Sequence, residues 1–231
     1  MSPKASAGKP IYSITPFTLL DYPQRSACIF WFAGCNMRCS YCYNPEIVFG
    51  KGKLSIDDAL AFLKTRRGLL DAVVFSGGEC LLHKGIIPLA NSIREMGFLI
   101  KVDTNGSRPG VLQQLIESKL VNYVALDFKA LPANFSAITR SNLFAPFTKS
   151  LQLLVENDIP YEVRTTIHSE LIGNDEVRKM AIWLQQMGHQ GNYYLQHYRN
   201  GVDTIEELPY SMRNSYIQND AVENINLVIR G

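Results

Sequence analysis

The sequence has no run of about 18 apolar residues, so it predicts no membrane-spanning helix. Its N-terminus, Met-Ser-Pro-Lys-Ala-Ser-Ala-Gly, is polar and has no apolar stretch of the kind that a secretory signal requires. The net charge is only +2 in 231 residues, which is too small to favour binding to nucleic acid or to an anionic membrane. We therefore expect a cytoplasmic protein that has neither of these partners.

The sequence also has no low-complexity segment and no linker that would divide it. Hydrophobic residues make up 46% and charged residues 19%, which suits a large buried core and argues against disorder. We expect a single domain over residues 1–231. It would consist of an N-terminal segment at 1–24, a folded region at 25–200 and a less regular tail at 201–231.

Cysteine is scarce, and its number, five, is odd. In a cytoplasmic protein this favours metal binding or catalysis over disulfides. Cys35, Cys39 and Cys42 have the spacing C-x3-C-x2-C, whereas Cys28 lies in an apolar run and is expected in the core. Three thiolates on an iron–sulfur cube leave one iron open to a small molecule. On spacing alone, a zinc site completed by a distant histidine such as His83 stays an alternative.

Six apolar, strand-like runs alternate with segments of helical spacing. The runs are Ala27–Ala33, Ala72–Ser76, Phe98–Asp103, Tyr123–Lys129, Tyr161–Ile167 and Tyr193–Tyr198. The helical segments lie near residues 55–63, 86–97, 112–119, 151–157 and 174–188, the first with a cap at Ser55 and Asp58 three residues on. Apolar strands separated by helices predict a parallel sheet covered by helices. Six strands are two fewer than a full barrel, so we predict an α/β fold, a partial (β/α)6 barrel. Ile225–Ile229 has the composition of one more strand.

Polar residues follow the first four strands or end them, and the last two strands carry polar residues themselves; the C-terminal strand ends are where α/β proteins place their functional groups. They are the cysteine loop, Ser76-Gly77-Gly78-Glu79-Cys80, Asp103-Thr104-Asn105-Gly106, Asp127-Phe128-Lys129, Arg164-Thr165-Thr166 and Gln196-His197-Tyr198. This repeated agreement indicates an active site. For single residues a structural interpretation stays open. Asp103 and Asp127 are also suited to capping helices, and Arg164 to a structural ion pair. A lone histidine such as His197 is often a core residue, while His168 and His189 are expected at the surface.

The cysteine loop after the first strand, followed by Gly-Gly-Glu after the second, resembles the radical S-adenosylmethionine (SAM) superfamily. Asp21-Tyr22-Pro23, Asp-Thr-Asn-Gly after the third strand and Asp-x-Lys after the fourth resemble its glycyl-radical-enzyme activating enzymes. The branch most similar is the longer form of the anaerobic ribonucleoside-triphosphate reductase activating proteins. The resemblance covers roughly residues 11–200.

The resemblance implies that Cys35, Cys39 and Cys42 hold a [4Fe-4S] cluster whose fourth iron is chelated by SAM. One electron from the cluster would cleave SAM to a 5′-deoxyadenosyl radical, which would take a hydrogen atom from the substrate. The implied partner is a glycyl radical enzyme, with anaerobic ribonucleotide reductase as the first choice. Flavodoxin or ferredoxin would supply the electron, and the cofactors would carry the difficult chemistry.

The resemblance also implies a SAM pocket. Gly77 and Gly78 would let the backbone approach the methionine part of SAM, and the charge of Glu79 is opposite to that of its ammonium group. The other implied SAM-site residues are Asn44, Asp103, Thr104, Asp127 and His197. Lys129 would reach a carboxylate or the peptide substrate, and Arg164 would clamp an anionic group. A monovalent cation beside SAM is implied as well.

Two residues depart from the family pattern: Cys80 stands where proline is usual and Tyr43 where activating enzymes often have histidine. Two other hypotheses therefore stay in view. One is a radical SAM enzyme that acts on a small molecule, as 7-carboxy-7-deazaguanine synthase does. The other is a zinc- or cluster-bearing binding module that is not an enzyme.

Overall fold

The computed structural model describes residues 8–212 and 222–230. Parts of the predicted N-terminal segment and tail, namely residues 1–7, 213–221 and 231, therefore lie outside the described residues. The chain forms two compact units. Of the described residues, unit 1 comprises 8–36, 44–104 and 110–124, and unit 2 comprises 37–43, 105–109, 125–212 and 222–230.

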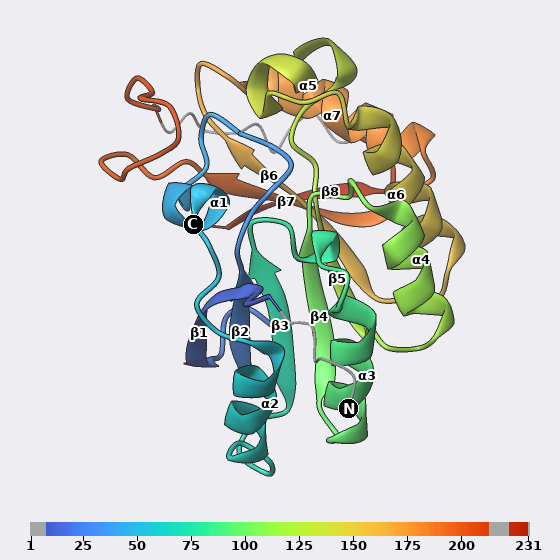
Figure 1. The fold of residues 1–231 in the computed structure, drawn as a ribbon. Helices are drawn as coiled ribbons and strands as arrows, with labels where there is room; N and C mark the ends of the chain where they lie inside the picture. The colour runs from blue at the N-terminus through green and yellow to red at the C-terminus, as the bar shows by residue number, and fades with distance from the viewer. Residues whose placement is uncertain (1–7, 213–221, 231) are drawn as a thin grey trace. The chain divides into compact units, whose positions relative to one another are not determined.

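Unit 1 contains parallel strands with one antiparallel strand at the edge (Figure 1). β1 (Ile11–Thr18) pairs antiparallel with β2 (Ala27–Phe32), which pairs parallel with β3 (Ala72–Gly77), and β3 pairs parallel with β4 (Leu99–Thr104). The sequence did not predict β1 because this strand mixes polar and apolar residues and contains Pro16. An edge strand tolerates proline, because one row of its backbone N–H groups has no ladder partner.

The helices of unit 1 include two elements that the sequence did not predict, α1 and η1. In chain order, the helices of unit 1 are α1 (Pro45–Phe49), α2 (Ile56–Lys64), the 3-10 helix η1 (Cys80–Leu82), α3 (Ile86–Glu95) and α4 (Pro109–Glu117). The first residue of α4 belongs to unit 2. α2 begins at the predicted cap. Asp58 N donates to Ser55 Oγ over 3.1 Å, and Ser55 N donates back to Asp58 Oδ2 over 2.8 Å, which forms a capping box.

β5 (Tyr123–Asp127) passes from unit 1 into unit 2 after Val124. In unit 2, β6 (Tyr161–Ile167), β7 (Gly191–His197) and β8 (Ile225–Arg230) pair parallel in sequence order, which confirms the additional strand near the C-terminus. The helices are α5 (Pro132–Thr139), α6 (Phe144–Glu156) and α7 (Asn174–Gln186). α5 has no regular apolar spacing, so the sequence did not predict it.

Aromatic packing holds α6 and α7 against the strands of unit 2. The ring of Phe128, just after β5, stacks on Phe147 with centroids 5.0 Å apart and lies 5.1 Å from Trp183. Phe128 and Phe147 are fully buried. All six predicted strands are present, and mainly parallel strands alternate with helices, so the predicted α/β class is confirmed.

Candidate active site

In unit 1, the last residue of β4 is hydrogen-bonded to a residue that follows β3. Thr104 Oγ1 donates to Glu79 Oε1 over 2.9 Å, and Leu81 N donates to the same oxygen over 3.1 Å. Glu79 is fully buried and Thr104 nearly so. A buried carboxylate requires such partners because losing water without them is costly. Two residues that the sequence placed in the SAM site therefore meet in the structure and also stabilise each other.

Asp103 forms a buried ion pair within the same unit. Lys101 Nζ lies 2.8 Å from Asp103 Oδ1, with only 3% and 9% of the two side chains exposed. Ser76 Oγ donates to Asp103 Oδ2 over 3.1 Å. Removing one partner of a buried ion pair strongly destabilises a protein. Asp103 therefore has a structural role that does not depend on any cofactor.

The Gly-Gly-Glu turn packs against the backbone that enters the cysteine loop. Gly77 has a φ of +116°, and a Cβ atom there would lie 2.4 Å from the N and O atoms of Phe32. A Cβ atom at Gly78 would lie 2.0 Å from Gly34 O and 3.2 Å from Cys35 Cβ. Glu79 N donates to Gly34 O over 2.9 Å. Only glycine fits both positions, so the turn forms a close cradle of backbone beside Cys35.

The three spaced cysteines lie on both sides of a unit boundary. Cys35 belongs to unit 1, and Cys39 and Cys42 belong to unit 2, where Cys42 N donates to Cys39 O over 3.0 Å. Cys35 and Cys42 are partly exposed, and Cys39 is 8% exposed. His83, the candidate zinc ligand, lies with Nε2 3.0 Å from Ala33 O, so this ring nitrogen already has a partner.

The other two cysteines differ sharply from these three. Cys28 and Cys80 are fully buried. Burial raises the pKa of the Cys28 thiol to about 12 and that of the Cys80 thiol well above its ordinary value. Cys80 Sγ lies 3.5 Å from Asp103 O, as a donor. A thiol that stays protonated is a poor metal ligand and a poor nucleophile, so both residues belong to the core.

The loop between Cys39 and Cys42 carries two buried hydroxyl groups. Ser40 and Tyr41 are 4% and 3% exposed, and neither hydroxyl has a hydrogen-bond partner in the part of the chain that the structure describes. Buried polar groups are nearly always hydrogen-bonded. These two hydroxyl groups therefore suit a polar ligand bound beside the loop. Neither residue was predicted from the sequence to belong to the site, although two hydroxyl residues between two cysteines are a visible signal.

In unit 2, Asp127 lies between two cations. Arg164 Nε donates to Asp127 Oδ1, and Lys129 Nζ donates to Oδ2 over 3.1 Å. Burial by itself would raise the pKa of Asp127, but the charges of Arg164 and Lys129 hold this pKa at about 2. Burial would likewise lower the pKa of Lys129, but the opposing charges, that of Asp127 first, raise this pKa above its ordinary value. Arg164 thus forms the structural ion pair that the sequence left open. The trio carries one net positive charge, which suits an anionic group.

Asn44 and His197 have less defined places. Asn44 precedes α1 without a side-chain cap, and its carbonyl oxygen accepts hydrogen bonds from Ile47 N and Val48 N over 3.1 and 3.0 Å. His197 is the last residue of β7 and is partly exposed. They lie in different units, so nothing in either unit brings them together.

Two other histidines were wrongly predicted to lie at the surface. His168 and His189 are 0% and 3% exposed. His168 Nε2 lies 3.0 Å from Pro209 O, and His189 Nδ1 lies 2.9 Å from the Tyr161 hydroxyl. Histidine can be buried when both ring nitrogens find partners. The second ring nitrogens contact Glu170 N and Asn192 O nearby, but Pro209 and Tyr161 are far away in the sequence, so local sequence could not show that both nitrogens are satisfied.

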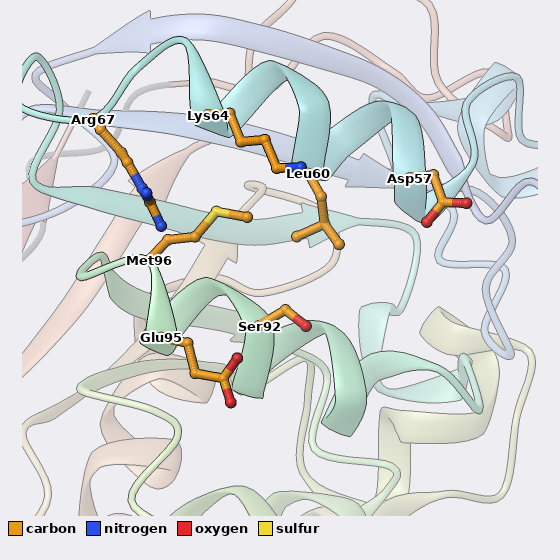
Figure 2. A pocket seen from close by; sticks show the side chains of 7 residues that line it. All are labelled: Asp57, Leu60, Lys64, Arg67, Ser92, Glu95 and Met96. Atoms are coloured by element: carbon orange, nitrogen blue, oxygen red, sulfur yellow. The ribbon is translucent and has the colours of Figure 1, made fainter.

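Unit 1 also has a groove of about 430 Å³ between α2 and α3 (Figure 2). It is lined by Asp57, Leu60, Lys64, Arg67, Ser92, Glu95 and Met96. None of the sequence-predicted site residues lines this groove. Its mixed charges and open form give it no evident chemistry.

Comparison with known proteins establishes the family. Residues 29–181 match the Radical SAM superfamily. A Methanocaldococcus jannaschii protein assigned as a glycyl-radical enzyme activating enzyme is 30% identical over 181 residues, 74% of this chain and 73% of its own. The pyruvate formate-lyase-activating enzyme of Clostridium pasteurianum is 29% identical over 211 residues, 87% of this chain and 81% of its own. The chain therefore belongs to the radical SAM superfamily, in its class of glycyl-radical enzyme activating enzymes.

Shorter and more distant similarities also exist. A 7-carboxy-7-deazaguanine synthase of Halobacterium salinarum is 34% identical over only 77 residues, 32% of this chain and 30% of its own. Among solved structures, Streptococcus suis SuiB has a TM-score of 0.65 at 14% identity, covering 86% of this chain and 47% of its own. A structure of anSMEcpe with bound AdoMet has a TM-score of 0.58 at 16% identity, covering 80% and 50%. This chain thus spans about half of each solved chain, and the likeness confirms the predicted radical SAM fold.

Proteins of this superfamily use a [4Fe-4S] cluster and SAM, and residues present here fit both. The chain provides three thiolates within eight residues, a glycine-only cradle beside Cys35, and two unpartnered buried hydroxyl groups between Cys39 and Cys42. No group of three His, Cys, Asp or Glu side chains within residues 8–212 and 222–230 is arranged to hold a metal ion. In a four-iron cluster each thiolate binds a different iron, so its ligands do not converge on one ion. No helix in these ranges is long and apolar enough to cross a membrane.

Proposed function

We propose that this enzyme installs a glycyl radical on a partner protein, and that Cys35, Cys39 and Cys42 are the cluster ligands. The observation that supports this most strongly is the similarity to activating enzymes over 74–87% of the chain. The Radical SAM match at residues 29–181 includes the C-x3-C-x2-C loop. Held by these three thiolates, a [4Fe-4S] cluster would supply one electron for the cleavage of SAM, and the products would be methionine, 5′-deoxyadenosine and a glycyl radical on the partner. The donor of that electron would be flavodoxin or ferredoxin.

The protein's own residues would hold SAM in place. In unit 1, the Gly77-Gly78 turn presents backbone atoms beside Cys35. Asn44, Asp103 and Thr104 would complete that part of the pocket. Glu79 has one carboxylate oxygen bound by Thr104 and Leu81, and its negative charge would attract the SAM ammonium group. Fixed, buried partners suit this role because they add little reorganisation on binding.

In unit 2, the charged trio would bind a carboxylate. Lys129 and Arg164 both donate to Asp127, and together they leave one excess positive charge. Lys129 would contact the carboxylate of SAM or the substrate peptide. Arg164 would keep Asp127 ionised. His197, at the end of β7, would contact SAM. The monovalent cation that we expect beside SAM would need ligands other than Asp127, because both oxygens of this carboxylate already accept from Arg164 and Lys129.

For the target, we favour anaerobic ribonucleotide reductase. The support is the resemblance of the sequence to the longer form of the anaerobic ribonucleoside-triphosphate reductase activating proteins. Asp21-Tyr22-Pro23, Asp-Thr-Asn-Gly and Asp-x-Lys support the activating-enzyme class as a whole. Pyruvate formate-lyase is the other glycyl radical enzyme to test, because the Clostridium pasteurianum relative is named for activating it. Such a reaction fits the cytoplasm of an anaerobically growing cell.

A small-molecule substrate is the second candidate. It is supported by the 34% identity with a 7-carboxy-7-deazaguanine synthase, but this match covers 32% of the chain. The activating-enzyme matches cover more than twice that share. The first candidate is therefore favoured.

The first experiment is 5′-deoxyadenosine release by the reconstituted protein with SAM and dithionite, without oxygen. We expect release that disappears in Cys35→Ala, Cys39→Ala and Cys42→Ala variants. Addition of a candidate reductase or lyase carrying α-deuterated glycine should transfer deuterium to 5′-deoxyadenosine and generate a glycyl radical signal. Deuterium transfer from 7-carboxy-7-deazaguanine precursors instead would favour the second candidate. A protein that takes up one zinc and no iron would be the binding module.

A further inference from the structure

The cysteine loop, residues 37–43, is hydrogen-bonded along one edge to the end of α5. Arg38 N donates to Thr139 O over 2.8 Å, and Ser40 N donates to Ile138 O over 3.0 Å. All four residues belong to unit 2. The acceptors are two of the last carbonyl groups of α5, which have no partner within the helix, so the loop satisfies the C-terminal end of α5.

The opposite edge of the loop is bound by a segment far away in the sequence. Glu206 N donates to Ser40 O over 3.1 Å, and Ile205 N donates to Cys42 O over 3.2 Å. The backbone of Ser40 is therefore fixed on both sides, and that of the proposed cluster ligand Cys42 on one side. These bonds also satisfy carbonyl groups of a mostly buried loop.

An ion pair connects the two segments that flank the loop. Arg140, which follows α5, donates from Nε and Nη2 to Glu206 Oε1 over 2.9 and 2.7 Å. The Arg140 and Glu206 side chains are 53% and 37% exposed. Thr204 Oγ1 donates to Glu206 O over 2.6 Å, which shapes the turn that presents the two donor N–H groups. An exposed pair contributes little to global stability, so its effect should be local.

The segment 198–212 that carries Ile205 and Glu206 is closed at its base. Asn200 and Ser211 exchange two hydrogen bonds of 2.9 and 2.8 Å. Near the other end of the cysteine loop, the Tyr43 ring stacks on Tyr198 at 5.6 Å, and the Tyr43 hydroxyl accepts from Arg199 N over 2.7 Å. The base and the tip of this segment are therefore both defined by contacts.

We propose that residues 198–212 are a brace that positions Cys39 and Cys42, with Arg140 and Glu206 as the positioning residues. The loop would then have its ligand-binding form before the cluster arrives, which lowers the ordering cost of cluster binding. Tyr43 contributes a second contact to the brace, at the position where activating enzymes often have histidine. The part of the proposal that concerns cluster retention rests on the proposed cluster ligands; the part that concerns loop order does not.

The test compares Glu206→Gln, Arg140→Gln and the exchange Arg140→Glu with Glu206→Arg, using Glu207→Gln as the matched control, because exposed Glu207 is the next residue of the same turn. In the cluster-free protein, we expect several-fold faster alkylation of Cys39 and Cys42 in both single variants, and faster amide exchange at Ile205 and Glu206. The double variant, Arg140→Glu with Glu206→Arg, should restore much of the protection against alkylation and amide exchange. The control variant Glu207→Gln should have the wild-type rates of alkylation and amide exchange. The thermal midpoints of all these variants should stay close to that of the wild type. Ile205→Pro, which removes the N–H group that donates to Cys42 O, should have a larger effect.

In the reconstituted protein, the same variants should lose iron to a chelator several-fold faster than wild type. The proposal would be overturned if the single variants and Ile205→Pro had the wild-type rates of cysteine alkylation and amide hydrogen exchange. So would equal acceleration at Cys28 or a large fall in the thermal midpoint, because either would mean general unfolding. If the wild-type protein takes up no iron but the cluster-free results hold, the proposed cluster ligands are wrong and the brace stands.

Discussion

Thr104 and Glu79 join the ends of two neighbouring parallel strands through a single buried hydrogen bond of 2.9 Å. One residue follows β3 and the other ends β4, so the bond fixes the two strand ends that carry most of the proposed SAM pocket in unit 1. Glu79 accepts from Leu81 N as well. The same carboxylate would therefore both hold the pocket together and provide its charge.

Removing the Thr104 hydroxyl should separate these two roles. We expect Thr104→Val to lower the free energy of unfolding by about 1–3 kcal/mol, because Glu79 loses a buried donor. SAM affinity should fall less than in Glu79→Ala, since Thr104→Val removes one pocket hydroxyl but keeps the carboxylate charge. Chemical denaturation and calorimetric SAM titration of the reconstituted protein would measure the two effects.

Glu79→Ala should instead weaken SAM binding strongly and leave the cluster in place. It should also destabilise the protein, because Thr104 Oγ1 and Leu81 N both lose their acceptor. Iron content and SAM titration are the measurements. Loss of the cluster in this variant would mean that Glu79 is a structural residue only.

The cysteines should fall into two classes of reactivity. In the cluster-free, folded protein, we expect a neutral-pH alkylating reagent to leave Cys28 and Cys80 unmodified, because burial raises both pKa values and blocks access. Cys35 and Cys42, which are partly exposed, should react. Mass mapping after proteolysis would give the result, and modification of Cys28 before Cys35 would contradict it.

Cys28→Ala is the matched control for Cys39→Ala: the first should keep the cluster and the second should lose it.

Much of the fold follows from simple features of the sequence. Continuous apolar runs such as Ala72–Ser76 predicted the buried strands, and the Ser55 cap predicted the start of α2 because both signals are local. β1 escaped because an edge strand needs neither a continuous apolar run nor freedom from proline. α5 escaped because tertiary packing stabilises it without a regular apolar stripe.

The site was predictable in kind but not in detail. Residue types at strand ends indicated where polar groups gather. Whether Arg164 clamps a ligand or pairs with Asp127 depends on partners that sequence does not locate. Lys101 shows the same limit: a lysine within an apolar strand signals a buried partner, but only the structure identifies Asp103.

The ionised state of Asp127 should contribute to stability in a defined pH range. Its folded pKa of about 2 lies below the unfolded value of about 3.9. Because the folded form binds this proton less readily, the contribution is complete above about pH 4 and is lost as the pH falls from about 4 to about 2. Acid unfolding of the cluster-free protein would measure it. Asp127→Asn should flatten the pH dependence in that window, and an unchanged slope would show that Asp127 is not the group responsible.

Gly78→Ala should be one of the most disruptive small substitutions in the chain. The added Cβ atom would lie 2.0 Å from Gly34 O and 3.2 Å from Cys35 Cβ, and the first neighbour is backbone that cannot rotate away. We expect a loss of about 1–3 kcal/mol or more in the free energy of unfolding, as for overpacked sites, together with reduced cluster content because Cys35 must move.

Gly110→Ala is the matched control, since a Cβ atom there meets nothing within 4 Å and the residue lies in α4. It should stabilise the protein by up to about 1 kcal/mol through lower chain entropy. Denaturation curves and iron content of the two variants, measured side by side, test the packing of the Gly-Gly-Glu turn against the cysteine loop. Equal stability of the two variants would mean that the turn can shift away from Gly34 at no cost.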